Sequence, residues 1–130
     1  MYVGYLTSQT VEASSPYVFT TKYITNNNIR YNSANGVLTF LKPGWYEIQF
    51  DTSAGGVGDI TPTLVLNGTA STYALADMSS TANTVLVNGA FSTIVYVSPA
   101  PNFTFSTLQI VNKGVSAETI TANLIVKRIG

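Results

Sequence analysis

The feature that most constrains the fold of this chain is the way short apolar runs alternate with turn residues. Short runs of β-branched and aromatic residues recur along the chain, each bounded by Gly, Pro, Asn or Asp. No stretch keeps apolar residues at helical spacing for three turns. The sequence therefore predicts an all-β protein. We expect strands near residues 2–7, 17–24, 28–32, 36–41, 45–52, 61–67, 71–76, 84–97, 103–112 and 119–129.

The segments between these runs predict antiparallel pairing. Asn35-Gly36, Asn67-Gly68 and Asn88-Gly89 have the residue types that tight hairpins require, and Pro43-Gly44 suits a type II turn. Short strands without intervening helices pack as two sheets rather than as a parallel α/β sheet. We expect residues 1–130 to form one domain, a two-sheet antiparallel jelly-roll sandwich of about ten strands.

Two segments are apolar on both faces of the strand. They are Phe91–Val97 and Asn123–Ile129. In a two-layer sandwich the outer face has no partner layer, so another subunit is the simplest cover. The alternative is a scatter of exposed apolar residues, which is common on protein surfaces. The candidate subunit interface consists of Phe91, Ile94, Tyr96, Ile125 and Ile129.

Composition narrows the choice of partners. Charged residues make up 9% of the chain, and six basic residues cancel six acidic ones, without any basic cluster. Nucleic acid is therefore not an expected partner. No apolar run approaches the roughly 20 residues of a membrane span, and Met1–Ser15 lacks the features of a secretory signal. We expect self-association, because the net charge is near zero and 45% of residues are hydrophobic. We expect any export to use a route other than a secretory signal, such as release of assembled particles by lysis.

Catalytic chemistry has few candidates. His and Cys are absent, which excludes Ser-His-Asp and Cys-His arrangements and the usual zinc ligands. Glu47 and Asp51 share a strand face at about 13 Å, longer than either glycosidase geometry. The prediction is a protein that is not an enzyme and has no cofactor. The acidic residues are Glu12, Glu47, Asp51, Asp59, Asp77 and Glu118.

Three residues are candidates for ligand contacts: Trp45, Asp59 and Asp77. Trp45 alternates with core positions, so its indole can stack on a sugar ring or pack against a loop or subunit. Asp59 and Asp77, with Asp51, can supply oxygen ligands for calcium, but they lack Asp-x-Asp-x-Asp spacing, and solvated carboxylates are the simpler interpretation. No metal site is predicted. Gly-rich Ser53–Asp59 is not followed by a helix or a Lys-Ser/Thr pair, so it indicates a flexible loop rather than a phosphate site.

Residues 29–54, IRYNSANGVLTFLKPGWYEIQFDTSA, resemble the signature hairpin of the complement C1q and tumour necrosis factor (TNF) superfamily. Residues 61–69, TPTLVLNGT, fit its next hairpin. Residues 107–130 are similar to the close of bacterial C1q-like domains, especially the C-terminal domains of collagen-like exosporium glycoproteins. The resemblance implies a jelly roll that forms a homotrimer, with both termini near the base and apical loops free for partners. The charged apical residues that bind calcium in some members are missing.

The leading hypothesis is a structural and adhesive trimer. It would be a bacteriophage capsid decoration, head-fibre or spike protein, or a bacterial spore or cell-surface component. Its partners would be other copies of itself, capsid or surface-layer proteins, and cell-surface glycans contacted through the loops Ser53–Ile60 and Ser79–Thr84. The alternative is a monomeric carbohydrate-binding module, which subunit number would distinguish. A small hydrolase is a distant third.

Overall fold

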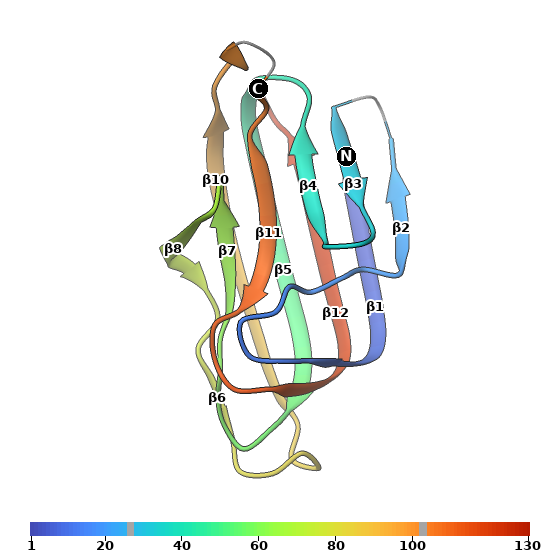
Figure 1. Ribbon diagram of the computed structural model, residues 1–130, viewed down its shortest axis with the longest axis vertical. Coiled ribbons are helices and arrows are strands. Elements are labelled where there is room, and N and C mark those ends of the chain that lie inside the picture. The colour runs from blue at the N-terminus through green and yellow to red at the C-terminus, as the bar shows by residue number, and fades with distance from the viewer. Residues whose placement is uncertain (26–27, 102–103) are drawn as a thin grey trace.

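The computed structural model describes residues 1–25, 28–101 and 104–130. Figure 1 shows the strands and their order in space. The strands in these residues are β1 (Tyr2–Val11), β2 (Thr21–Ile24), β3 (Ile29–Asn32), β4 (Val37–Phe40), β5 (Gly44–Gly55), β6 (Gly58–Ile60), β7 (Pro62–Leu66), β8 (Thr69–Leu75), β9 (Met78–Ser80), β10 (Val87–Val97), β11 (Thr107–Asn112) and β12 (Ala117–Arg128).

Two five-stranded antiparallel sheets pack against each other. We call them sheet A, with the order β10-β5-β12-β1-β2, and sheet B, with the order β3-β4-β11-β7-β8. In the view of Figure 1, sheet B lies in front of sheet A. The short strands β6 and β9 form a separate pair. The predicted two-sheet antiparallel jelly-roll sandwich is confirmed.

The core lies between the two sheets and is rich in aromatic residues. On β5, Tyr46, Ile48 and Phe50 are at most 2% exposed, while the residues that alternate with them point to the other face of sheet A. The ring of Tyr46 packs on Phe40 of sheet B. Burying each large apolar side chain contributes roughly 1.5–3 kcal/mol to folding. Most of the aromatic density after the Lys42-Pro43-Gly44 turn therefore stabilises the sandwich.

Strand boundaries differ from the prediction in four places. β1 continues to Val11 through a polar stretch, because it pairs with β12 along its length. Residues 17–20 do not form a strand, and Pro16 makes only an isolated bridge to Val111. Strands β6 and β9 were not predicted, since three residues are too few to show a period. The predicted strand 103–112 begins at residue 107, and residue 103 lies outside the described residues.

Two of the three predicted Asn-Gly turns are present in the structure. Gly36, Asn67 and Gly68 have the positive φ angles that tight turns require. Asn88-Gly89, in contrast, is not a turn but lies inside β10, where Gly89 pairs with Thr52. The prediction there was wrong because glycine serves packing rather than turning: a Cβ on Gly89 would collide with the sulfur of Met78.

The two ends of the sandwich differ in construction. Both chain termini lie at one end, the base, as the resemblance implied (Figure 1). There the amino group of Met1 donates to the carbonyl of Thr25, and the amide of Trp45 donates to the carbonyl of Gly130. The opposite end, the cap, carries the β5–β6, β9–β10 and β11–β12 connections. Among the described residues, no helix is long and apolar enough to cross a membrane.

Candidate interaction surfaces

The outer face of sheet A carries a group of large apolar side chains near the base. Trp45, Ile94, Tyr96 and Ile129, the base cluster, are each between 46% and 53% exposed. Tyr96 pairs with Trp45 across β10 and β5, and the amide of Ile129 donates to the carbonyl of Trp45 at 2.8 Å. The ring centroids of Trp45 and Tyr96 lie 5.1 Å apart. This end of the sheet therefore presents an apolar surface without a partner among the described residues.

The predicted interface residues do not all lie on this surface. Ile94, Tyr96 and Ile129 belong to the base cluster, and Ile125 is half-buried on the same face, where it pairs with Gln49. Phe91 lies on the opposite face of β10 and stacks on Phe50 at a centroid distance of 5.4 Å, so it packs against the core.

Trp45, a candidate ligand contact whose indole could stack on a sugar ring or pack against a loop or subunit, belongs to this surface. The signal was present in the sequence: Trp45 alternates with buried Tyr46 and Ile48, and it follows a turn that brings it to the base. Its pairing with Tyr96 was not readable, because the register between β5 and β10 is set by long-range packing.

Strand β10 forms an unprotected edge of sheet A. Natural proteins protect sheet edges with short strands, charges, prolines or irregular pairing. β2 and β3 are four residues long and carry Lys22 and Arg30, and β8 pairs with β7 through a register shift. β10 is 11 residues long, has no charge or proline, and pairs with β5 in an unbroken register. Such an edge favours contact with another polypeptide.

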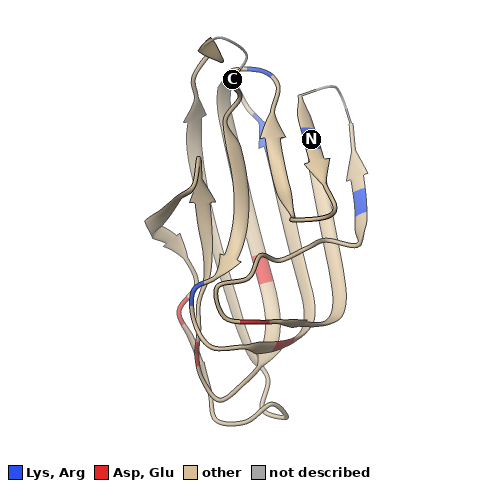
Figure 2. Cartoon of the chain, in the orientation of Figure 1, with Lys and Arg blue, Asp and Glu red and all other residues tan. Residues whose placement is uncertain are grey.

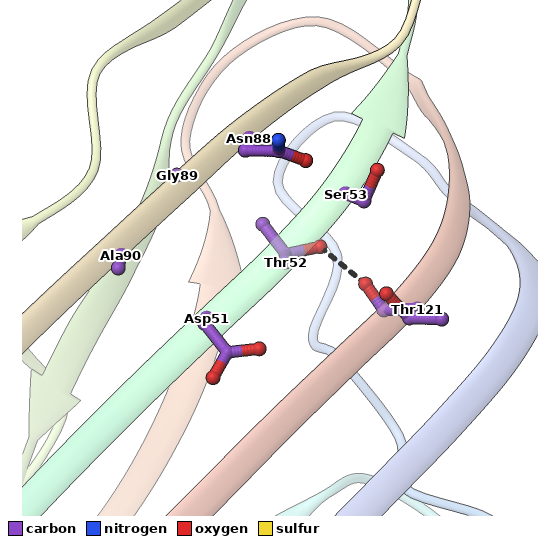
Figure 3. A pocket seen from close by; sticks show the side chains of 7 residues that line it. All are labelled: Asp51, Thr52, Ser53, Asn88, Gly89, Ala90 and Thr121. Atoms are coloured by element: carbon purple, nitrogen blue, oxygen red, sulfur yellow. Dashed lines mark hydrogen bonds between the residues drawn. The ribbon is translucent and has the colours of Figure 1, made fainter.

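Further from the base, the outer face of sheet A contains a polar hollow of about 360 Å³. Figure 3 shows its lining from β5, β10 and β12. The hydroxyl of Thr52 donates to the carbonyl of Thr121 at 2.8 Å, and the Asp51 carboxylate accepts from the Asn123 amide at 2.9 Å. The residues that line it are Asp51, Thr52, Ser53, Asn88, Gly89, Ala90 and Thr121. The hollow exists because β10 presents small side chains here, in contrast to the base cluster.

The Gly-rich segment after β5 forms the centre of the cap. Two other connections pack so closely on it that side chains are excluded. A Cβ on Gly55 would collide with the backbone of Asn83, and one on Gly56 would lie 2.7 Å from the carbonyl oxygen of Ser116. A Cβ on Gly58 would lie 3.3 Å from Val115. The sequence predicted a flexible loop, and the structure shows a tightly packed junction of three connections.

Asn112, at the end of β11, holds the cap together and was not identified from the sequence. Its side chain is fully buried and its amide donates to the carbonyls of Val11 and Val115, at 3.2 and 2.7 Å. Its side-chain oxygen accepts from the amides of Gly114 and Thr61. One amide group therefore links β1, the β6–β7 junction and the β11–β12 connection.

The three candidate ligand contacts do not form one site. Asp59 and Asp77 line a hollow of about 310 Å³ with Met78 and Ser79 at the β6–β9 pair. Trp45 lies at the base, at the other end of the molecule. In the described part of the chain, no group of three or more potential metal-ligating carboxylates is present.

Charge is unevenly distributed along the long axis (Figure 2). Acidic residues are concentrated toward the cap, and basic residues toward the base. At the cap end, Glu12 follows β1, Asp59 lies in β6, Asp77 precedes β9 and Glu118 lies near the start of β12, with Lys113 in the β11–β12 connection as a basic neighbour. Although the net charge of the chain is zero, the cap end is therefore negative.

Comparison with models of protein families finds no match to this chain. Comparison with curated protein sequences finds none either. Comparison of structures finds Eiger TNF from S. frugiperda, with a TM-score of 0.67, 10% identity, and coverage of 98% of this chain and 92% of that chain.

Two further structures are similar to this protein over nearly the whole of both chains. The PRD1 vertex protein P5 has a TM-score of 0.60 and 13% identity, over 99% of this chain and 96% of that chain. Murine APRIL has a TM-score of 0.61 and 9% identity, over 97% of this chain and 98% of that chain. Because these similarities span nearly the whole of each chain, the protein has the jelly-roll fold of these three structures.

Proposed function

We propose that residues 1–130 form one jelly-roll domain that assembles as a homotrimer and serves as a non-enzymatic structural and adhesive protein. Its setting is the surface of a virion, as a capsid decoration, head-fibre or spike protein, or the surface of a bacterial cell or spore. In either setting the base faces the particle and the cap loops face a receptor. Capsid or surface-layer proteins hold the base, and receptor contact is made through residues 53–60 and 79–84.

The observation that carries self-association is the base cluster beside the unprotected β10 edge. Trp45, Ile94, Tyr96 and Ile129 leave apolar surface exposed on a sheet face that has no covering layer among the described residues. Exposed apolar patches of this kind mark interaction sites. The family resemblance implies that the cover is two further copies of the chain.

The setting on a particle is supported by similarity to the PRD1 vertex protein P5, a phage protein that shares the fold over nearly the whole chain. Similarity at this level of sequence identity shows a shared fold but not a shared function. The role on a particle is therefore our proposal. The similarity to Eiger TNF and murine APRIL supports the same fold in an extracellular setting.

The non-enzymatic part of the proposal is supported by the placement of the carboxylates. Glu47 accepts a hydrogen bond from Gln49, and Asp51 accepts one from Asn123. These two acids therefore interact with different neighbours rather than with a shared site. Paired acid and base chemistry requires groups held on one substrate.

The alternative function, a monomeric carbohydrate-binding module, would use the polar hollow around Asp51 and Asn88. Its hydroxyl, amide and carboxylate groups suit sugar hydroxyls, but no aromatic residue is among those that line it. The two proposals differ in subunit number. A trimer should scatter light as three times 13.9 kDa, and a chain that stays monomeric at high micromolar concentration would contradict the trimer.

The placement on the particle has its own test. Electron microscopy of the native particle, with labelled antibody against the domain, should locate it on the virion or cell surface. An intact particle that lacks the label would contradict the structural role, whatever the subunit number.

A further inference from the structure

The cap presents a group of aliphatic side chains that the core does not use. We call Val57, Val85, Leu86 and Val115 the cap patch. Val57 is 70% exposed, and the other three are between 36% and 48% exposed. They come from three connections, β5–β6, β9–β10 and β11–β12. Four aliphatic side chains from three separate segments thus reach solvent at one end of the sandwich.

These segments are held together by specific contacts. Val115 packs beside Gly58, the residue after Val57. The carbonyl oxygen of Val85 would lie 3.1 Å from a Cβ on Gly55, and the same oxygen accepts a hydrogen bond from the buried hydroxyl of Ser80 at 2.6 Å. The β9–β10 and β11–β12 connections therefore pack on the glycine-rich β5–β6 connection, and these contacts hold the cap patch in place before any partner binds. Preorganised surfaces lose less conformational entropy on binding.

The chemistry of the cap patch argues against a sugar as its ligand. Sugar recognition uses aromatic faces and dense hydrogen-bonding groups, whereas the four residues of the patch are aliphatic. Exposed Trp45 and Tyr96 lie at the base and cannot serve the cap.

Acidic groups accompany the patch. The carbonyl of Asp59 accepts from the amide of Val115 at 2.7 Å, which places Asp59 next to the patch, and Asp77 shares a hollow with Asp59. The border of the patch therefore carries two acidic residues and one basic residue, Lys113, which lies in the same connection as Val115, so the border is net acidic. Such a surface is complementary to apolar side chains flanked by cations.

We infer that the cap patch is a docking surface for a protein segment that combines aliphatic or aromatic side chains with Lys or Arg. This deepens the proposed function by naming the partner class of the cap, and it rests on that proposal only for the orientation of the cap away from the particle. A glycan receptor, expected from the sequence, becomes the competing outcome.

The test uses the full chain as bait for a displayed library of random 12-residue peptides, with a glycan array probed in parallel. Peptides enriched on the wild-type protein should combine Lys or Arg with Leu, Ile, Phe or Trp. Their affinity should fall about tenfold with Val57→Ser plus Leu86→Ser, and also with Asp59→Asn plus Asp77→Asn. Added salt should weaken the wild-type interaction more than that of the Asn variant.

Tyr73→Ser is the matched control, because it removes an exposed apolar side chain on β8, away from the patch, and should leave peptide binding unchanged. The inference is overturned by failure to enrich any peptide, by enrichment of acidic peptides, by binding that ignores both cap variants, or by glycan binding that depends on the patch. Light scattering of each variant distinguishes a loss of peptide binding from a loss of trimer assembly, because the cap patch is complete on a single subunit.

Discussion

The rings of Trp45 and Tyr96 lie 5.1 Å apart on neighbouring strands of sheet A, and both are half exposed. They form the aromatic part of a surface that includes Ile94 on the unprotected edge strand β10 and, on the other side of β5, Ile129 after β12. An aromatic pair gains little from remaining in water, and buried aromatic side chains dominate the energetics of many interfaces. This pair is therefore where self-association should be most sensitive to substitution.

Trp45 is the only tryptophan, so its fluorescence reports directly on the base cluster. As protein concentration rises, emission should move to shorter wavelength, because a second copy removes water from the indole. Tyr96→Ala should shift this transition to higher concentration, by an amount equivalent to about 2 kcal/mol. Val85→Ala at the cap is the control and should leave the transition in place. Emission that is independent of concentration in a sample shown to associate would place the interface elsewhere.

Ile94 and Val95 are adjacent in sequence but face opposite sides of sheet A, so the same substitution should act differently at each. Ile94→Asp places a charge on the exposed face, and it should yield a folded monomer. Val95→Asp places a charge in the core, where Val95 is 6% exposed, and should destabilise the fold by several kcal/mol.

Circular dichroism melts and light scattering separate these two effects. Val57→Asp, an equivalent change at the cap, should remain both folded and trimeric. If Ile94→Asp still assembles as a trimer, the base cluster is not the interface.

Asn112 should be far more important for stability than a surface asparagine. Asn112→Asp keeps the size of the side chain but replaces two amide donors with a buried carboxylate, so the carbonyls of Val11 and Val115 lose their donor. We expect a loss of roughly 3 kcal/mol or more in the free energy of unfolding. Urea unfolding would measure it, with Asn32→Asp at an exposed position as the control. Equal stability of both variants would show that the cap does not depend on this network.

Substitution of Tyr17, in contrast to substitution of Asn112, should not destabilise the protein. Its hydroxyl is buried without a hydrogen-bond partner among the described residues, so Tyr17→Phe should keep or raise stability at neutral pH. Tyr46→Phe is the matched control. It removes a bond from the Tyr46 hydroxyl to the carbonyl of Lys42, and should cost about 0.5–1.5 kcal/mol. A larger loss for Tyr17→Phe than for Tyr46→Phe would contradict this assignment.

Tyr17 also makes the free energy of unfolding depend on pH in the alkaline range. Burial raises the pKa of Tyr17 well above its ordinary value of 10.0, and burial does the same for Tyr2. Below about pH 10 both phenols are neutral in the folded and unfolded states, and their contribution to stability is complete. Above that pH the unfolded chain ionises first, so each tyrosine should lower stability by about 1.4 kcal/mol per pH unit. Tyr17→Phe should reduce this slope in urea titrations between pH 9 and 11, and an unchanged slope would show that Tyr17 ionises in the folded state.

The sequence by itself determined the class of fold. Alternation such as that of Tyr46, Ile48 and Phe50 requires one buried and one outer face, and the Asn67-Gly68 turn requires an antiparallel hairpin. The two-faced pattern of Phe91–Val97 likewise indicated apolar residues on both sides of the strand. These are local properties, and local physical chemistry is sufficient to read them.

Only the tertiary structure decided which side chains share a surface. Trp45 and Tyr96 are neighbours because β5 and β10 pair in one register, and Phe91 faces the core because that register places it over Phe50. The glycines of the cap are required by connections that arrive from distant parts of the chain, and Asn112 joins segments as far apart as Val11 and Val115. Such contacts depend on how the two sheets pack, and no period or turn motif in the sequence encodes them.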